Sequence, residues 1–294
     1  MTEEKILFDT DIGSDIDDAV CLAYLLSQPR CRLMGITTVS GEPVERAKLA
    51  SAICRVAGKD VPIYPGTEPP LLTPPRQPKS PQSAKLANWP HDTDFPQNQA
   101  VEFMVRTIRE NPGEITLLAV GPMTNVALLF ATYPDVPGLL KQLVLMCGVF
   151  TNALPHVGPL EWNAICDPYA TAIVYNAPVK RHVSIGLDVT CQVVMGRDEV
   201  KERFQTKLLR PVLDFADVWF QHTDQITFHD PLAGVVLFED VCGFRRGDVE
   251  VELASPRLLG LCHFEAKEDG RHEVALQVDR EGFFRHYFET VSRY

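Results

Sequence analysis

The sequence predicts an α/β fold with a mostly parallel open sheet flanked by helices. Three observations support this prediction. Apolar runs of strand length alternate with helical segments through the first two thirds of the 294 residues, which is typical of βαβ units. Polar turns follow several of these runs, at the sheet edge where ligands of such folds bind. Hydrophobic residues make up 45% of the chain, which is enough for a large core.

The predicted elements follow one another along the chain. We expect strands at residues 5–8, 33–39, 61–64, 115–120, 142–146 and 182–185. We expect helices at residues 17–27, 43–57, 97–110, 124–132 and 167–175, then at 197–207, 209–222, 231–238 and 280–294. Alternating runs at residues 249–253 and 272–278 predict a small antiparallel excursion near the C-terminus.

A proline-rich segment at residues 65–96 interrupts this alternation. We interpret it as a long loop over the carboxyl edge of the sheet, because loops of this length are usually lids or disordered segments. The chain shows no internal repeat and no clear linker. We therefore expect one domain spanning residues 1–294.

Composition limits the class of protein. A net charge of −11 argues against nucleic acid or an anionic membrane surface as a partner. No apolar run is long enough to cross a membrane, and the polar N-terminus lacks the core of a signal peptide, so we expect a cytoplasmic protein. The eight cysteines are scattered without a CxxC pair and are typical of reduced core residues.

The most informative feature is a group of five aspartates between a predicted strand and a predicted helix. They are Asp9, Asp11, Asp15, Asp17 and Asp18. Carboxylates this close repel one another unless a cation lies among them, and an all-oxygen set suits a hard divalent ion such as Ca²⁺ or Mg²⁺. The alternative is a solvated acidic loop whose aspartates cap the helix, which accounts for only one or two of them.

Three further motifs could contribute to a site, and each has a simpler explanation. Thr124 follows a Gly-Pro turn, where it could cap a helix or leave a backbone carbonyl facing a metal. Glu161 and Asn163 could hold sugar hydroxyls, although Trp162 between them could belong to the core. His229 could donate a proton near neutral pH, while the neighbouring Asp230 could cap a helix.

Together these motifs resemble those of the inosine–uridine-preferring nucleoside hydrolases. The resemblance extends over essentially the whole chain, and its segments appear in the family's order: DTDIGSDIDDA (9–19), ITTVSG (36–41), GPMTN (121–125), EWN (161–163), LDVT (187–190) and HDPLA (229–233). The aspartate turn and the His-Asp-Pro sequence are its most specific parts. Members of this family are dimers or tetramers, so the resemblance implies a homo-oligomer.

The resemblance implies a Ca²⁺-dependent enzyme that cleaves the N-glycosidic bond of ribonucleosides. It implies that Asp11 is the general base that activates a water held by the metal, and that Asp11 is also a metal ligand. It implies further metal ligands in the carboxylates of Asp18 and Asp230 and in the backbone carbonyl of Thr124. The reaction passes through an oxocarbenium-like sugar, which nearby carboxylates stabilise.

The resemblance also implies substrate contacts. Asp17, Glu161 and Asn163 correspond to residues that bind the ribose hydroxyls, and Met146 corresponds to the residue beneath the sugar. His229 corresponds to a group that assists departure of the base.

The chain departs from the family pattern at several positions. Asp15 is an additional acid that lengthens the first motif, and Glu42 stands where the family usually has a substrate-binding asparagine. We therefore expect Glu42 to affect substrate contacts or the charge at the metal. The sequence assigns no role to four other candidates for the pocket: Trp89, His91, His156 and His222.

Two other functions remain open at this point. Asp9 and Asp11 after a strand also open the haloacid-dehalogenase-type phosphatases, in which Asp9 would be the nucleophile and Mg²⁺ the ion. That hypothesis gives no role to the motifs at residues 161–163 and 229–231. Alternatively, the chain could bind a metal and a nucleoside without catalysis because of Glu42. The base preference, purine or pyrimidine, does not follow from the sequence.

Overall fold

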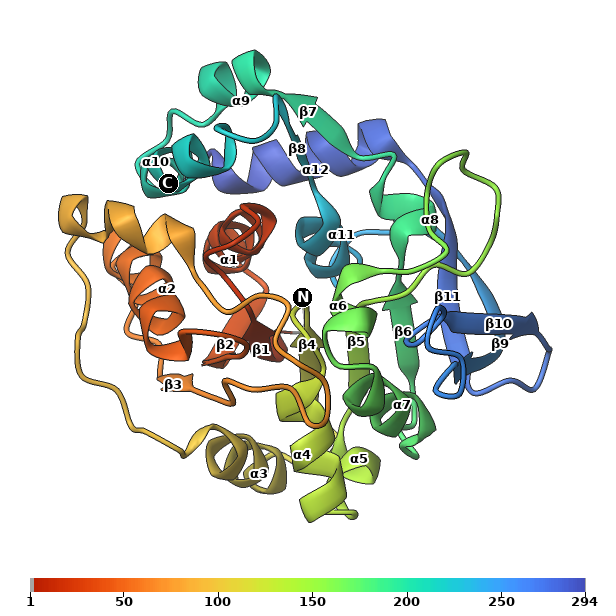
Figure 1. Ribbon diagram of the computed structural model, residues 1–294. Helices are drawn as coiled ribbons and strands as arrows, with labels where there is room; N and C mark the ends of the chain where they lie inside the picture. Colours follow the sequence, from red (N-terminus) through yellow and green to blue (C-terminus); the bar gives the residue numbers. More distant parts are fainter. Residues whose placement is uncertain (1–2, 294) are drawn as a thin grey trace.

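The computed structural model describes residues 3–293 (Figure 1). Its main sheet has nine strands in the order β10-β9-β11-β6-β5-β4-β1-β2-β3. The strands are β1 (Glu4–Thr10), β2 (Cys31–Thr38), β3 (Ile63–Pro65), β4 (Ile115–Ala119), β5 (Gln142–Met146), β6 (His182–Ile185), β9 (Cys242–Val251), β10 (Cys262–Ala266) and β11 (His272–Val278).

The sheet confirms the predicted fold class. From β3 to β11 every neighbouring pair is parallel, and only β9 and β10 run antiparallel to their neighbours. The predicted antiparallel excursion is therefore present, but its first strand, β9, is longer than predicted and β10 was not predicted. A separate two-stranded sheet of β7 (Val194–Gly196) and β8 (Gln225–Thr227) was also not predicted.

Helices cover both faces of the sheet, as Figure 1 shows. One face packs against α1 (Asp17–Ser27), α2 (Pro43–Ala57), α10 (Leu209–Trp219), α11 (His229–Val235) and α12 (Arg280–Val291). The other packs against α3 (Ala100–Glu110), α4 (Thr124–Thr132), α5 (Val136–Leu139) and α7 (Pro168–Asn176). Shorter helices are α6 (Trp162–Cys166), α8 (Leu187–Thr190), α9 (Arg197–Arg203) and the 3₁₀ helix η1 (Pro81–Asn88).

The central strands are buried on both faces and divide the core into two apolar clusters. In β1, Ile6 and Phe8 point into one cluster while Leu7 points into the other. Successive side chains of a strand point to opposite faces, so a strand covered on both sides must be apolar throughout. This requirement explains why the strands appear in the sequence as continuous apolar runs.

Several element boundaries differ from the prediction. Asp167 lies before α7 rather than inside it, because its side chain caps the helix by accepting from the Ala170 N–H. The helices predicted at residues 97–110, 197–207 and 209–222 are shorter, and the 65–96 segment contains η1. The final helix ends at Val291, and Tyr294 lies outside the described residues. No helix within residues 3–293 is long and apolar enough to cross a membrane.

The cysteine prediction is confirmed, since all eight cysteines are free and seven of them are buried. Two histidines were not singled out by the sequence but lie in the core. His182 on β6 and His272 on β11 are 2% and 1% exposed, and their rings meet edge to face beside Tyr175. Burial, and then the neighbouring His272, lowers the pKa of His182 well below 6.5, so the folded protein holds this imidazole neutral.

We expect the buried His182 to make the fold acid-sensitive. The unfolded chain protonates this histidine near pH 6.5 while the folded chain does not, so acid favours the unfolded state by about 1.4 kcal/mol per pH unit below that point. His182→Phe should reduce the slope of unfolding free energy against pH, measured by denaturant titration between neutral and mildly acidic pH. The exposed His263→Phe serves as control, and an unchanged slope in His182→Phe would contradict the prediction.

Candidate functional site

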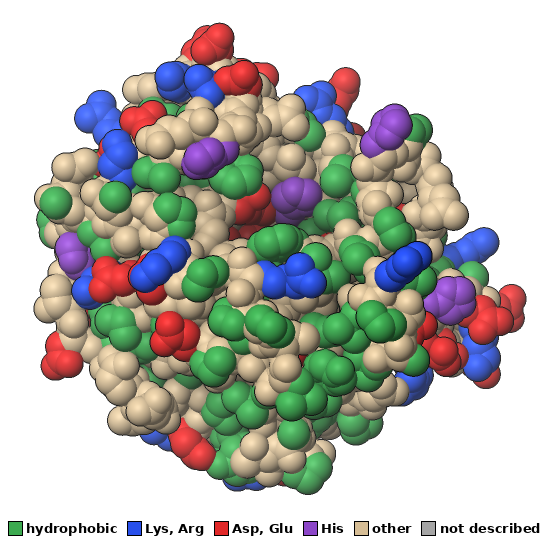
Figure 2. All heavy atoms as spheres, viewed as in Figure 1, with side chains coloured by type: hydrophobic (Ala, Val, Ile, Leu, Met, Phe, Trp, Pro, Cys, Tyr) green, Lys and Arg blue, Asp and Glu red, His purple; other side chains and the backbone are tan. Residues whose placement is uncertain are grey.

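A pocket of about 520 Å³ opens at the carboxyl edge of the parallel strands. Figure 2 shows acidic side chains and a histidine at the bottom of a hollow in this face. The volume suits a ligand of nucleoside size. The lining includes most of the predicted site residues and comprises Asp11, Ser14, Asp15, Asp17, Asp18, Gln77, Pro78, Lys79, Pro81, Val120, Met146, Glu161, Trp162, Asn163, Leu187, Val218, Trp219, His222, His229 and Asp230.

Three carboxylates at the bottom of the pocket form a cluster that could hold a metal ion. Asp17, Asp18 and Asp230 each offer an oxygen within 4.8 Å of the others, and each is 3% exposed. Asp17 and Asp18 open α1 and Asp230 lies in the first turn of α11, and these two helices pack together. The Asp230 N–H donates to Asp17 (3.0 Å) and the Thr10 hydroxyl donates to Asp18. An all-carboxylate set of this kind fits a hard divalent cation.

The electrostatics of the cluster favour a bound cation. Burial, followed by repulsion between neighbouring carboxylates, raises the pKa values of Asp17, Asp18 and Asp230 well above 3.8. Burial also raises the pKa of Asp15 to about 7. Among the described residues, no Lys, Arg or His forms an ion pair with any of these aspartates. A divalent cation would restore the ionised form that burial disfavours.

A buried arginine shapes the turn that carries these aspartates. Arg46 on α2 is 0% exposed. Its guanidinium donates to the backbone carbonyls of Asp11 and Ile12, and to those of Gly41 (2.7 Å) and Lys79 (3.0 Å). It therefore joins the aspartate turn to the turn after β2 and to the 65–96 loop. It forms no ion pair with the carboxylates, but its positive charge acts against burial by lowering the pKa values of Asp11 and Asp18.

Asp11 lies at the end of β1, beside the cluster, and is 6% exposed. Gln77 from the 65–96 loop donates to Asp11 Oδ2 at 2.5 Å. A Cβ atom at Gly121 would lie 2.8 Å from Asp11 Oδ1, so only glycine leaves room for this carboxylate. Burial raises the pKa of Asp11, and the ionised form required of a general base depends on nearby positive charge.

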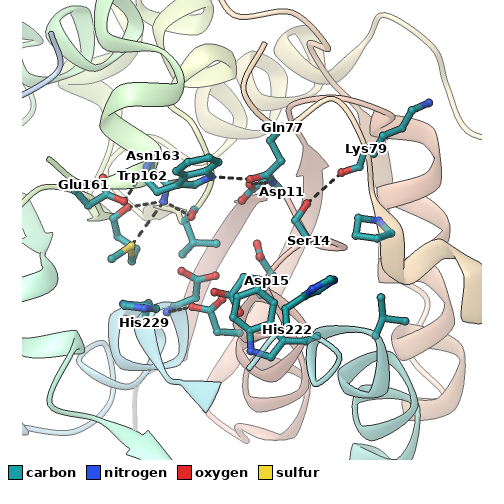
Figure 3. A pocket seen from close by; sticks show the side chains of 18 of the residues that line it. Asp11, Ser14, Asp15, Gln77, Lys79, Glu161, Trp162, Asn163, His222 and His229 are labelled. Carbon is teal, nitrogen blue, oxygen red and sulfur yellow. Dashed lines mark hydrogen bonds between the residues drawn. The ribbon is translucent and has the colours of Figure 1, made fainter. Parts of the chain in front are cut away.

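Two of the three residues predicted to bind the ribose hydroxyls, Glu161 and Asn163, lie together on the neighbouring wall (Figure 3), while the third, Asp17, belongs to the carboxylate cluster. Glu161 caps α6, accepting from the N–H groups of Asn163 (2.7 Å) and Ala164 (2.9 Å). The Asn163 amide donates to the backbone carbonyls of Val120 (2.7 Å) and Met146 (3.0 Å). These bonds fix both side chains at the edge of the pocket before any ligand binds.

His229 and a set of aromatic residues form the remaining walls. His229 Nδ1 lies 2.7 Å from the Thr190 hydroxyl, and burial lowers the pKa of His229 to about 4. The imidazole is therefore neutral at physiological pH. Trp162, which is 48% exposed, lies on the pocket wall together with Trp219 and His222.

Asp9 has a different environment from the other aspartates. It is 0% exposed and does not line the pocket. One of its carboxylate oxygens accepts from the Thr37 hydroxyl and from the Asn125 amide (2.8 Å), and burial raises its pKa to about 7. A carboxylate that is fully buried outside the pocket is out of reach of a phosphate ester, so the phosphatase hypothesis is not supported.

Comparison with known proteins gives the family. The model of the inosine-uridine preferring nucleoside hydrolases matches residues 6–285. This chain belongs to that family.

Relatives and solved structures agree with this assignment. This nucleoside hydrolase is 30% identical to the probable uridine nucleosidase 2 of Oryza sativa subsp. japonica over 85% of this chain and 79% of the relative. It is 29% identical to uridine nucleosidase 1 of Arabidopsis thaliana, over 85% and 78% of the two chains. Its fold matches a purine-preferring ribonucleoside hydrolase from Gardnerella vaginalis with a TM-score of 0.84 and 23% identity, covering 99% and 98% of the two chains.

Two predicted site residues lie outside the pocket of this nucleoside hydrolase. Thr124 is buried, does not line the pocket, and its hydroxyl donates to Asp167 (2.8 Å) rather than capping α4. Glu42 accepts from Lys79 and from the Ser80 N–H (2.9 Å), and the Lys79 bond in particular lowers its pKa to about 2. The predicted effect of Glu42 on substrate contacts therefore lacks a structural basis.

The remaining candidates divide in the same way. Trp89 donates to Asp214 and, with His91 and His156, does not line the pocket, whereas His222 does. No side-chain cap bond is made at the start of α1 or of α11, and Asp11, Asp17, Asp18 and Asp230 are buried, so the alternative of a solvated acidic loop is not supported. Sequence reasoning missed Val120 and Gln77. Val120 could have been found as the last residue before the Gly-Pro turn, but no sequence signal distinguishes Gln77 within the loop.

We expect the carboxylate cluster to destabilise the metal-free protein. Asp18→Asn removes one buried like charge, so in excess chelator the variant should melt at a higher temperature than the wild type. Excess Ca²⁺ should raise the wild-type melting temperature, because an ion present at 100 times its Kd adds about 2.7 kcal/mol to the free energy of unfolding. This gain in melting temperature should be largely lost in Asp18→Asn.

The exposed Asp60→Asn is the matched control and should behave as wild type in both thermal scans. If the melting temperature of the wild type is the same with Ca²⁺, with Mg²⁺ and with chelator, the cluster does not bind a metal ion.

Proposed function

We propose that this chain hydrolyses the N-glycosidic bond of ribonucleosides to ribose and free base with Ca²⁺ as cofactor. The observation that carries the proposal is the placement of the three-aspartate cluster and Asp11 at the bottom of a pocket of nucleoside size. The family assignment supports the reaction class, since its members are nucleoside hydrolases. The ion and the roles of individual residues are our inference.

Asp18 and Asp230, with Asp17 beside them, would hold the ion. Asp11 lines the same pocket and would complete the carboxylate set. Val120, which follows β4, lines the pocket, and its backbone carbonyl accepts from the Asn163 amide; we propose this carbonyl as the backbone ligand in place of that of Thr124, which does not line the pocket. When bound, Ca²⁺ would offset the carboxylate charge and supply Lewis acidity to the attacking water.

Asp11 would take the proton from the attacking water. Its Oδ2 is already bonded to Gln77, so Oδ1 is the atom proposed to receive the proton. Glu161 and Asn163, with Asp17, would bind the ribose hydroxyls, and Met146 would lie beneath the sugar. As the bond to the base breaks, positive charge develops on the sugar, and the surrounding carboxylates stabilise it more than they stabilise the neutral substrate.

His229 would assist departure of the base. Because its imidazole is neutral, we propose that it donates a hydrogen bond from a ring N–H to the leaving base, which takes its proton from solvent water, while Asp11 returns to solvent the proton that it accepted. Trp162, Trp219 and His222 line the same pocket and would provide surfaces against which a planar base can pack. The names of the relatives include both uridine and purine preference, so both kinds of base belong in a substrate test.

The structure removes the main argument for a non-catalytic binder. That hypothesis depended on Glu42 changing the pocket, but Glu42 does not line the pocket, and its carboxylate accepts from Ser80 and from Lys79, which lies on the pocket wall. By family analogy we also propose a homo-oligomer, dimer or tetramer, which sedimentation would test.

We expect chelator-sensitive ribose release from at least one nucleoside in a panel of purine and pyrimidine ribosides. Asp11→Ala should lower kcat by a factor of about 100 or more, because removing a general base typically costs two to four orders of magnitude. A reducing-sugar assay with and without Ca²⁺ measures both effects.

Asp60→Asn again serves as the control and should retain wild-type ribose release. Undiminished turnover in Asp11→Ala would refute the proposed role of Asp11, and phosphate release from an aryl phosphate would revive the phosphatase hypothesis.

A further inference from the structure

Gln77 forms a bridge between two walls of the pocket. Its side-chain nitrogen donates to Asp11 Oδ2 (2.5 Å), and its side-chain oxygen accepts from the indole N–H of Trp162 (2.6 Å). Figure 3 shows both bonds above the carboxylates. Three residues that are far apart in the sequence, from the end of β1, the 65–96 loop and α6, thus form one continuous chain of hydrogen bonds.

The chemistry of the two partners fixes the orientation of the Gln77 amide. An indole N–H can only donate, so it must meet the amide oxygen, and an ionised carboxylate can only accept, so it must meet the amide nitrogen. Trp162 therefore aims the donating end of Gln77 at Asp11. Reversing the amide would break both bonds.

The backbone of Gln77 is anchored independently of its side chain. Its carbonyl accepts from the Gly41 N–H and from the Ser40 hydroxyl, both at 3.2 Å. A Cβ atom at Gly41 would lie 2.4 Å from the backbone of Pro78, so glycine is required for this close approach. The side-chain amide thus extends from a fixed backbone, and no backbone freedom of Gln77 needs to be lost when the amide bonds to Asp11.

We propose that Gln77 is a positioning residue that holds the carboxylate of Asp11 in its reactive orientation, with Trp162 acting through Gln77. The inference rests on the proposed function, in which Asp11 takes the proton from water. By occupying Oδ2, the amide leaves Oδ1 as the free acceptor and restricts rotation of the carboxylate. Misplacing a catalytic group by about 1 Å can cost 100-fold in rate.

Steady-state kinetics tests the proposal. Gln77→Leu should lower kcat about 10- to 100-fold, the range typical of supporting residues around a site, with KM changed less than about threefold. Gln77→Glu keeps the acceptor for Trp162 but replaces the donor with a second carboxylate, so it should be at least as impaired. Trp162→Phe should lower kcat when Gln77 is present. The same substitution should lower kcat little further in the Gln77→Leu background, since Trp162 and Gln77 act on Asp11 through one bridge.

Gln97→Leu is the matched control. Gln97 lies directly after the 65–96 loop and is exposed, and among the described residues its side-chain amide donates to the Phe95 carbonyl alone. Its kcat and KM should equal those of the wild type. If Gln77→Leu instead raises KM at unchanged kcat, Gln77 is a substrate contact and the positioning role is overturned.

A second readout separates this inference from the proposed function. The indole N–H resonance of Trp162, assigned by its absence in Trp162→Phe, should move in Gln77→Leu and in Asp11→Ala but not in Gln97→Leu. If the chemical shift of this resonance is unchanged in Gln77→Leu, the bridge is absent in solution and the inference fails, whatever the enzymatic activity. If the bridge is present but the wild type releases no ribose from any nucleoside, the proposed function fails while the link from Gln77 to Asp11 stands.

Discussion

The site depends on one electrostatic constraint, the burial of several carboxylates at the carboxyl edge of a parallel sheet. Asp17, Asp18 and Asp230 are nearly inaccessible to water and close enough to repel one another. A buried carboxylate without a positive partner is driven toward its protonated form. The arrangement is thus costly in the metal-free protein and becomes favourable when a hard cation lies among the oxygens. The same buried carboxylates therefore govern both the stability of the protein and its proposed activity.

The surrounding structure shapes the backbone around these carboxylates, and within residues 3–293 no basic side chain forms an ion pair with them. Arg46 is fully buried but donates to backbone carbonyls of three separate segments. Gly121 admits the carboxylate of Asp11, and Gly41 admits the 65–96 loop. Both glycines are needed for close approach, since a side chain at either position would displace the group beside it. The same contacts bring Gln77 to Asp11 and thereby join the loop to the reactive edge.

Local patterns were sufficient for most of the fold. Strands buried on both faces carry near-continuous apolar runs, such as residues 6–8 in β1 and 143–146 in β5, so their positions and the parallel sheet could be predicted. Boundaries were less certain, because a cap such as Asp167 and a short helix such as α6 depend on side-chain bonds that the apolar pattern does not encode. The strands β7 and β8 have only three residues each, too few for a periodicity to be recognised.

The sequence by itself determined the α/β class, the acidic turn after the first strand and, through the family resemblance of its motifs, eight of the residues that line the pocket, because these follow from apolar periodicity and local motifs. Only the tertiary structure decided which of these side chains come together in space and which do not. It brought Asp17 into the cluster with Asp18 and Asp230, turned Thr124 and Glu42 away from the pocket, and brought Gln77 to Asp11 across 66 positions of the chain. Such contacts depend on how distant turns pack, and chain packing leaves no local signature in a loop.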